Sequence, residues 1–177
     1  MTNALRYIAI PFLVVALISA YGLYQTTDNY VSAASTYLKG GISHLELSFE
    51  ENGDALFNLT IELQNMGTKL AVKLKTISCR LYTKDFVDTN YLGAGERSYL
   101  SSTPPYGTIP PGEKLVIDVE IRVLNGSRYM QRLMDAREGS GYIVSAFGDV
   151  KYELVEFPEW DKSIPLFYPP MVVSPHV

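Results

Sequence analysis

Two histidines, His44 and His176, and one cysteine, Cys79, could together with a methionine suggest a mononuclear copper site. A mononuclear copper site needs a histidine and a methionine a few residues beyond the cysteine, but residues 80–84 read Arg-Leu-Tyr-Thr-Lys. With so few histidines, no Ser-His-Asp arrangement can be argued. We therefore predict no catalytic residue, no bound cofactor and no metal site. A contribution of His176 to the metal of a partner membrane enzyme is the most distant alternative.

The sequence contains two glycosylation sequons, Asn58-Leu-Thr60 and Asn125-Gly-Ser127. Asn58 lies on the outward parity of its expected strand, so a glycan there would leave the core intact. Asn125 lies in an expected loop, and Ser127 competes for a second role as a helix cap. We treat both asparagines as possible glycan acceptors.

The formal net charge of the 177-residue chain is −4, which does not suit a nucleic-acid-binding protein, because such proteins present a concentrated basic face. One stretch is basic, and it has two possible roles. It could contact anionic headgroups or an acidic partner, or it could be a solvated face that protects an edge strand. The stretch comprises Lys69, Lys73, Lys75, Arg80 and Lys84.

Residues Tyr7–Tyr24 contain no charged side chain, and their eighteen positions are near the lower limit for crossing a bilayer as a helix. Tyrosines flank this run at both ends, as in an aromatic belt. Arg6 precedes the run and Asp28 is the first charge after it, which favours a cytoplasmic N-terminus. We predict a cytoplasmic N-terminus and transmembrane helix over 1–25, anchoring a single-pass protein of the cell membrane whose remaining residues are extracytoplasmic.

A cleaved secretory signal is the alternative to the anchor, because Ala20-Tyr21-Gly22 is a possible cleavage site. The rest of the chain is exported in both interpretations. If the helix is retained, Ala16 and Ala20 lie four residues apart on one face. Small residues at this spacing allow another helix to approach closely, so we predict them as partner contacts.

Residues 26–41 are polar and small, which indicates a stalk or helical continuation ending at Gly40-Gly41. Over 42–156 the apolar period changes to two, which predicts strands separated by turns. The apolar parity reverses after Leu74, which predicts a bulge near Lys75-Thr76. Ser127 can cap a short helix that ends before Gly139, and Gly148-Asp149 predicts a bend. We therefore predict an all-β, immunoglobulin-like antiparallel β-sandwich with one short helix.

Three segments together resemble the late-embryogenesis-abundant type-2 family, also called the water-stress and hypersensitive-response (WHy) domain. They read FNLTIELQN (57–65), TIPPGEKLVIDVEIRV (108–123) and YIVSAFGDVKYEL (142–154). The resemblance spans about residues 42–154, although Asn65-Met66 replaces the Asn-Pro usual in the family. It implies a seven-stranded sandwich with one helix and no catalytic site, often tethered to a membrane, with roles in stress tolerance or interaction.

Residues 157–177 are rich in proline and aromatic side chains, and we expect an extended tail over the surface. Prolines reduce the entropy lost on binding, and exposed aromatics are typical interface anchors. The predicted function is a non-catalytic accessory or structural subunit of a larger membrane complex. The alternative is a free-standing stress-protective or cell-envelope interaction domain. The predicted partner contacts of the tail are Trp160, Phe167, Tyr168 and Met171.

Overall fold

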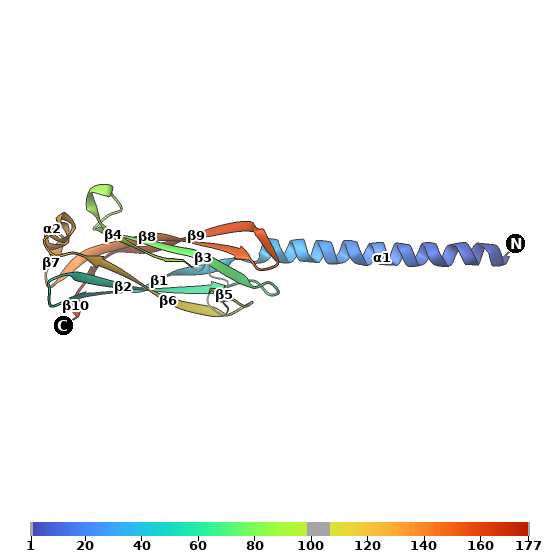
Figure 1. Cartoon of the computed structure of the whole chain (residues 1–177), viewed down its shortest axis with the longest axis horizontal. Coiled ribbons are helices and arrows are strands. Elements are labelled where there is room, and N and C mark those ends of the chain that lie inside the picture. The colour runs from blue at the N-terminus through green and yellow to red at the C-terminus, as the bar shows by residue number, and fades with distance from the viewer. Residues whose placement is uncertain (1, 99–106, 177) are drawn as a thin grey trace.

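The computed structural model describes residues 2–98 and 107–176, with side chains for 11–97 and 107–176. Helix α1 (Thr2–Ser35) projects from one end of a β-sandwich, and the chain ends at the opposite end of the molecule (Figure 1). Within the part of the chain whose side chains are described, no helix combines the length and apolar character needed to cross a membrane. The side chains of Arg6 and Tyr7, on which the predicted orientation and part of the aromatic belt rest, are outside the described side chains. Pro104-Pro105-Tyr106, where the prolines predict a turn, lies outside the described residues.

One sheet, which we call sheet A, has the strand order β10-β1-β2-β6. Strands β1, β2 and β6 are antiparallel neighbours, whereas β10 pairs in parallel with the end of β1. The bounds are β1 (Leu38–Phe49), β2 (Ala55–Asn65), β6 (Lys114–Val123) and β10 (Pro175–His176).

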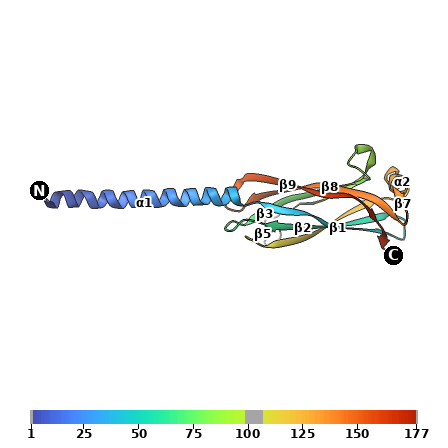
Figure 2. The same ribbon diagram turned by 180° about the vertical axis from the view of Figure 1, so that it is seen from behind.

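The second sheet, sheet B, has β3 and β8 at its centre, with β4 beside β3 and both β7 and β9 beside β8. The short strand β5 also pairs with β3. Figure 2 shows the two layers from behind. The bounds are β3 (Val72–Thr83), β4 (Tyr91–Ser98), β5 (Thr108–Ile109), β7 (Arg137–Glu138), β8 (Gly141–Leu154) and β9 (Phe157–Val173), with η1 (Asp88–Asn90) and α2 (Arg128–Asp135) outside the sheets.

The core lies between the sheets and is built from the inward parity of each strand. Alternate residues of β2 and β6 are buried, as their period of two predicts. The predicted bulge is confirmed, because the β3–β8 register shifts between Leu74 and Thr76, and the apolar residues on both sides of the shift are buried. The predicted helix is confirmed as α2, where the Ser127 hydroxyl accepts a hydrogen bond from the Met130 N–H at 3.1 Å.

Two predicted interruptions of strands are wrong. Strand β1 begins at Leu38 and continues through Gly40-Gly41, and β8 continues through Gly148-Asp149. A Cβ atom on Gly148 would collide with the Ser78 carbonyl oxygen of neighbouring β3. Glycine is therefore required there by close approach of another backbone, not by a bend.

The predicted tail is part of sheet B. Strand β9 pairs antiparallel with β8 from Leu154↔Phe157 to Tyr142↔Val173, so residues 157–173 are extended but integral to the sandwich. Its prolines argued against a strand, because proline cannot donate to a ladder. However, β9 is an edge strand that pairs with β8 alone, and an edge strand tolerates missing N–H donors.

Candidate functional site

The predicted chemical residues are separated in the structure. Cys79 is buried within β3, and burial, assisted by the charge of Asp149, raises the pKa of its thiol to about 12. The thiol is therefore unreactive near neutral pH. His44 lies on the outer face of sheet A, 3.0 Å from Glu46, whereas His176 pairs with Ser48 in the β10–β1 ladder. Among the described residues, no three His, Cys, Asp or Glu side chains are grouped to hold a metal ion.

The two sequons have different surroundings. Asn58 is half-buried on the outer face of sheet A, in register with Glu46 and Glu120. The Asn125 side-chain amide donates to the Asn52 carbonyl at 3.0 Å and lies against the turn between β1 and β2. A glycan on Asn125 would disturb this turn, whereas one on Asn58 would leave the core packing unchanged.

The most elaborate polar site of the described structure is the joint between α1 and the sandwich. Ser32, Ala33 and Thr36 are buried at the end of the helix. The Lys162 ammonium group donates to the Ala33 carbonyl at 2.9 Å and to the Thr36 carbonyl at 2.7 Å. A cation at a helix C-terminus satisfies carbonyls that lack intrahelical partners and interacts favourably with the helix dipole. Burial lowers the pKa of Lys162.

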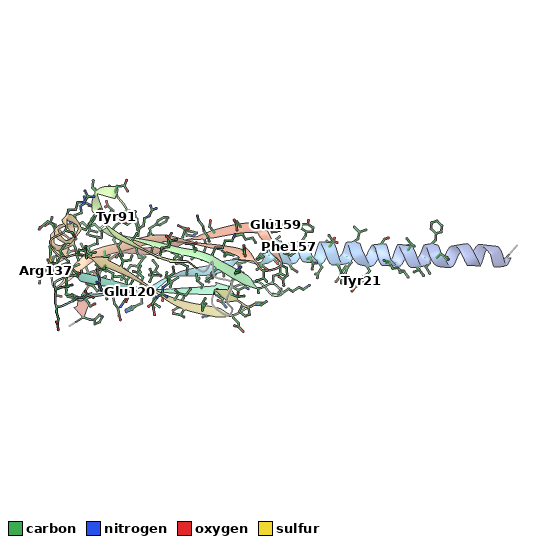
Figure 3. The ribbon with its side chains drawn as sticks, in the orientation of Figure 1. Tyr21, Tyr91, Glu120, Arg137, Phe157 and Glu159 are labelled. Carbon is green, nitrogen blue, oxygen red and sulfur yellow. The ribbon has the colours of Figure 1, made fainter. Side chains whose placement is uncertain are left out.

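Three aromatic side chains surround the same joint. Tyr30 of α1 lies with its ring centroid 6.0 Å from that of Trp160 and 6.5 Å from that of Phe157. Phe157 and Trp160 lie 5.8 Å apart. Figure 3 places Phe157 where the helix meets the sandwich. Such tilted aromatic pairs stabilise beyond their buried area.

Two further polar contacts fix the joint from other sides. The Lys69 ammonium group lies 2.6 Å from the Asp28 carboxylate of α1, and the Tyr152 hydroxyl accepts a hydrogen bond from the Leu38 N–H at 3.3 Å. The helix is thus held by β9 and by the segment before β3, while β8 holds the start of β1 directly after the helix. This arrangement fixes the direction in which α1 leaves the sandwich.

Sequence reasoning missed this joint. Lys162 and Tyr30 are distant in the sequence, and neither belongs to a motif. One signal was available: the last turn of α1 contains no basic residue, so a cation for its carbonyls had to come from elsewhere.

The predicted partner contacts divide into two groups. Trp160 packs against α1 of the same chain, and Tyr168 is half-buried against the core, so neither is a free anchor. Phe167 and Met171 are 53% and 50% exposed on β9. Ala16 and Ala20 are exposed on the part of α1 that projects away from the sandwich (Figure 1).

Two residues of the basic stretch, Lys73 and Lys75, form ion pairs within sheet B. The Lys75 ammonium group lies 2.6 Å from the Asp161 carboxylate and 3.0 Å from that of Glu153, and Lys73 lies 3.4 Å from Glu153. The hydrogen bond from Lys75, with a smaller contribution from Lys73, lowers the pKa of Glu153. The predicted protection of an edge strand is wrong, because β3 lies between β4 and β8 inside the sheet.

No protein-family profile and no curated protein matches this sequence. Two solved structures share part of its architecture. A Bordetella pertussis structural-genomics protein given the name ApaA is 11% identical, with a TM-score of 0.45, over 80% of this chain and 97% of that chain. A Northeast Structural Genomics Consortium target is 14% identical, with a TM-score of 0.44, over 81% of this chain and 92% of the other. These low scores carry no functional inference.

Proposed function

We propose that this protein is a non-catalytic β-sandwich module, anchored in the cell membrane by α1 and held outside the cytoplasm as an accessory or structural subunit of a membrane complex. The observation that carries the proposal is the exposure of α1. Phe12, Leu17 and Tyr24 are 75%, 62% and 69% exposed on a helix that projects away from the domain (Figure 1). Exposed apolar side chains around a whole helix are stable only where lipid or another protein covers them.

The joint supports the same proposal from the other end of the helix. A freely swinging tether would need neither the double hydrogen bond of Lys162 nor the aromatic contacts of Tyr30. A joint of this kind transmits the orientation of the helix to the domain. The sandwich would therefore stand at a fixed height and rotation above the bilayer, as a structural subunit requires.

The proposal includes an immunoglobulin-like sandwich of the late-embryogenesis-abundant type-2 kind. Two segments on which that resemblance rests, 57–65 and 108–123, contain the neighbouring strands β2 and β6, and Asn65 lies at the end of β2. The buried Asn65 amide donates to the carbonyls of Leu70 and Ile109 at 2.9 and 3.0 Å, and its side-chain oxygen accepts the Gly67 N–H at 2.8 Å. A fully satisfied buried asparagine of this kind fixes the path of three segments at once.

Membrane extraction with two arginine variants tests the anchor. Leu13 and Leu17 are each 62% exposed on α1, and Val116 is 58% exposed on β6. We expect the wild-type protein and Val116→Arg to stay in alkaline-washed membranes. The double variant Leu13→Arg/Leu17→Arg should be released, because each arginine costs about 2.5–3.5 kcal/mol at the centre of a membrane helix. Wild-type protein in the soluble fraction would contradict the anchor.

A native mass measurement in mild detergent tests the subunit role separately. We expect the intact chain to co-migrate with other membrane proteins in fixed stoichiometry. If the anchored protein contains only copies of itself in every mild detergent, the free-standing envelope domain replaces the subunit proposal, while the membrane anchor is retained.

A further inference from the structure

The outer face of sheet B carries an exposed apolar patch at the end far from α1. We define it as Phe86 and Val87 of the β3–β4 loop, Phe147 of β8 and Phe167 of β9. Their exposed fractions are 38%, 47%, 44% and 53%. The Phe86 ring lies 5.2 Å from that of Phe167 and 6.0 Å from that of Phe147, so the three phenylalanines form one cluster, with Val87 next to Phe86 in the chain. Clustered exposed aromatics mark contact surfaces.

A hollow of about 510 Å³ lies on the same face, on the β4 side of the β3–β4 loop. Tyr82 and Tyr91 form an edge-to-face pair in its lining, and Ala94 adds a short side chain. Arg80 and Asp88 provide one cation and one anion. Neither Arg80 nor Asp88 has an ion-pair partner among the residues that the structure describes.

The β3–β4 loop is built as a rigid protrusion. It stands out from the sandwich in both views (Figures 1 and 2). Lys84 adopts a φ of +62°, which is unusual for a side chain other than glycine, and its N–H donates to the Ile143 carbonyl at 3.2 Å. The Asn90 amide donates to the Asp85 carboxylate, and the Asn90 N–H donates to the Val87 carbonyl at 2.7 Å. Strain held in place by surrounding bonds often marks a functional segment.

A protrusion beside a hollow on one face gives the shape that a two-fold contact between identical chains needs, because each copy can place its loop in the hollow of the other. The charges are complementary under this exchange. Lys84 and Asp88 flank the apolar tip of the loop, and Asp88 and Arg80 lie in the hollow. The Asp88 carboxylate of each copy can therefore meet the Arg80 guanidinium of the other. A partner of strong single charge would not be matched by this mixed rim.

Addition of a strand at the sheet edge is a less suitable contact. The edge strand β9 contains Pro158, Pro165, Pro169 and Pro170, which remove N–H donors from its ladder. Strand addition at β9 is therefore disfavoured, which favours a contact through the face of the sheet.

We propose that two copies of this chain associate through the outer faces of their B sheets, the Phe86–Val87 tip of each entering the hollow between Arg80, Tyr91 and Asp88 of the other. This inference does not rest on the membrane proposal, because the surface lies at the end opposite α1 (Figure 1).

Site-specific cross-linking of the full chain in mild detergent tests the geometry. Cys79 is buried, so an introduced cysteine is the only accessible thiol. Mixing Val87→Cys protein with Ala94→Cys protein should give a covalent dimer under mild oxidation. Val116→Cys, exposed on sheet A, is the matched control and should give none. Equal cross-linking at position 116, or none for the mixture, would overturn the proposal.

Charge exchange tests the same contact by sedimentation equilibrium. Asp88→Arg should weaken self-association on the order of ten-fold, and Arg80→Asp/Asp88→Arg should restore it. Phe167→Ser should also weaken it by about ten-fold or more, with far-UV circular dichroism confirming an intact fold. A wild-type chain that is monomeric at every concentration would refute the dimer. So would a double variant that dimerises no better than Asp88→Arg alone.

Discussion

The outer faces of the two sheets differ, although both belong to one sandwich. The face of sheet A is polar across β1, β2 and β6, where register places Thr60 between His44 and Asp118 and places Asn58 between Glu46 and Glu120. The face of sheet B is charged near α1 but apolar at the far end, where Phe86, Phe147 and Phe167 gather. Figure 3 places Glu120 and Tyr91 on opposite sides of the sandwich.

This difference separates the requirements of folding from those of contact. An antiparallel sheet packed on one core needs an apolar inner face and a solvated outer face, and sheet A meets this rule except at the isolated Val116. The exposed phenylalanines of sheet B add nothing to the buried core between the sheets. A departure from the folding rule at one place on the surface is the signature of a contact site.

Removing an edge strand from each sheet in turn should give the largest difference in stability between the two sheets. A chain ending after Glu156 loses β9, the Leu166 core residue and the Lys162 bonds to α1, so we expect it to show no cooperative thermal unfolding. A chain ending after Ser174 loses only the short β10 pairing of sheet A, which should cost roughly 1 kcal/mol. Cooperative unfolding of the first truncation near the wild-type temperature would show that β9 is a dispensable tail.

Neighbouring positions on β6 compare the inner and outer faces of sheet A. Val119 is 1% exposed, so Val119→Asp buries an unpaired charge and should cost about 4 kcal/mol or more in urea unfolding. Glu120→Gln, on the polar outer face, should change the free energy of unfolding by about 0.5 kcal/mol or less. Similar losses at both positions would mean that the register of β6 is wrong.

A smaller change in stability should come from removing the ion pairs of Glu153 in the charged half of sheet B. The Lys75 and Lys73 contacts lower the pKa of Glu153 below its ordinary value of 4.5. Their stabilisation is therefore fully present above that value and is lost as the pH falls through the lower pKa of the folded state. Thermal unfolding of Glu153→Gln should show a weaker loss of stability with acid than the wild type, by roughly 1 kcal/mol. An unchanged acid slope would show that these ion pairs contribute nothing.

The sequence pattern alone was sufficient to predict elements whose residues alternate between a buried inner face and an exposed outer face. The alternation of β2 and β6, the parity reversal after Leu74 and the Ser127 cap of α2 could all be predicted, because each depends on neighbours in the chain. The continuation of β8 through Gly148 could not, because its cause is the Ser78 carbonyl, seventy residues away.

The candidate sites depended even more on distant contacts. The prolines of β9 favour a free tail in the sequence, and only the fold shows that an edge position accommodates them. Lys162 belongs to no local pattern that links it to α1. The sequence predicts Phe167 and Met171 as partner contacts, and the structure places both at exposed positions of β9. However, only the fold brings Phe167 beside Phe86, and only the fold assigns Trp160 to the joint with α1.

Labelling of whole cells tests most directly the claim that α1 holds this domain outside the cytoplasm. Val116→Cys places a thiol at a 58% exposed position of sheet A, away from the apolar patch, while Cys79 stays buried. A membrane-impermeant maleimide added to intact spheroplasts should label this variant fully and leave the wild type unlabelled. Labelling of Val116→Cys only after lysis would place the sandwich inside the cytoplasm and contradict the account.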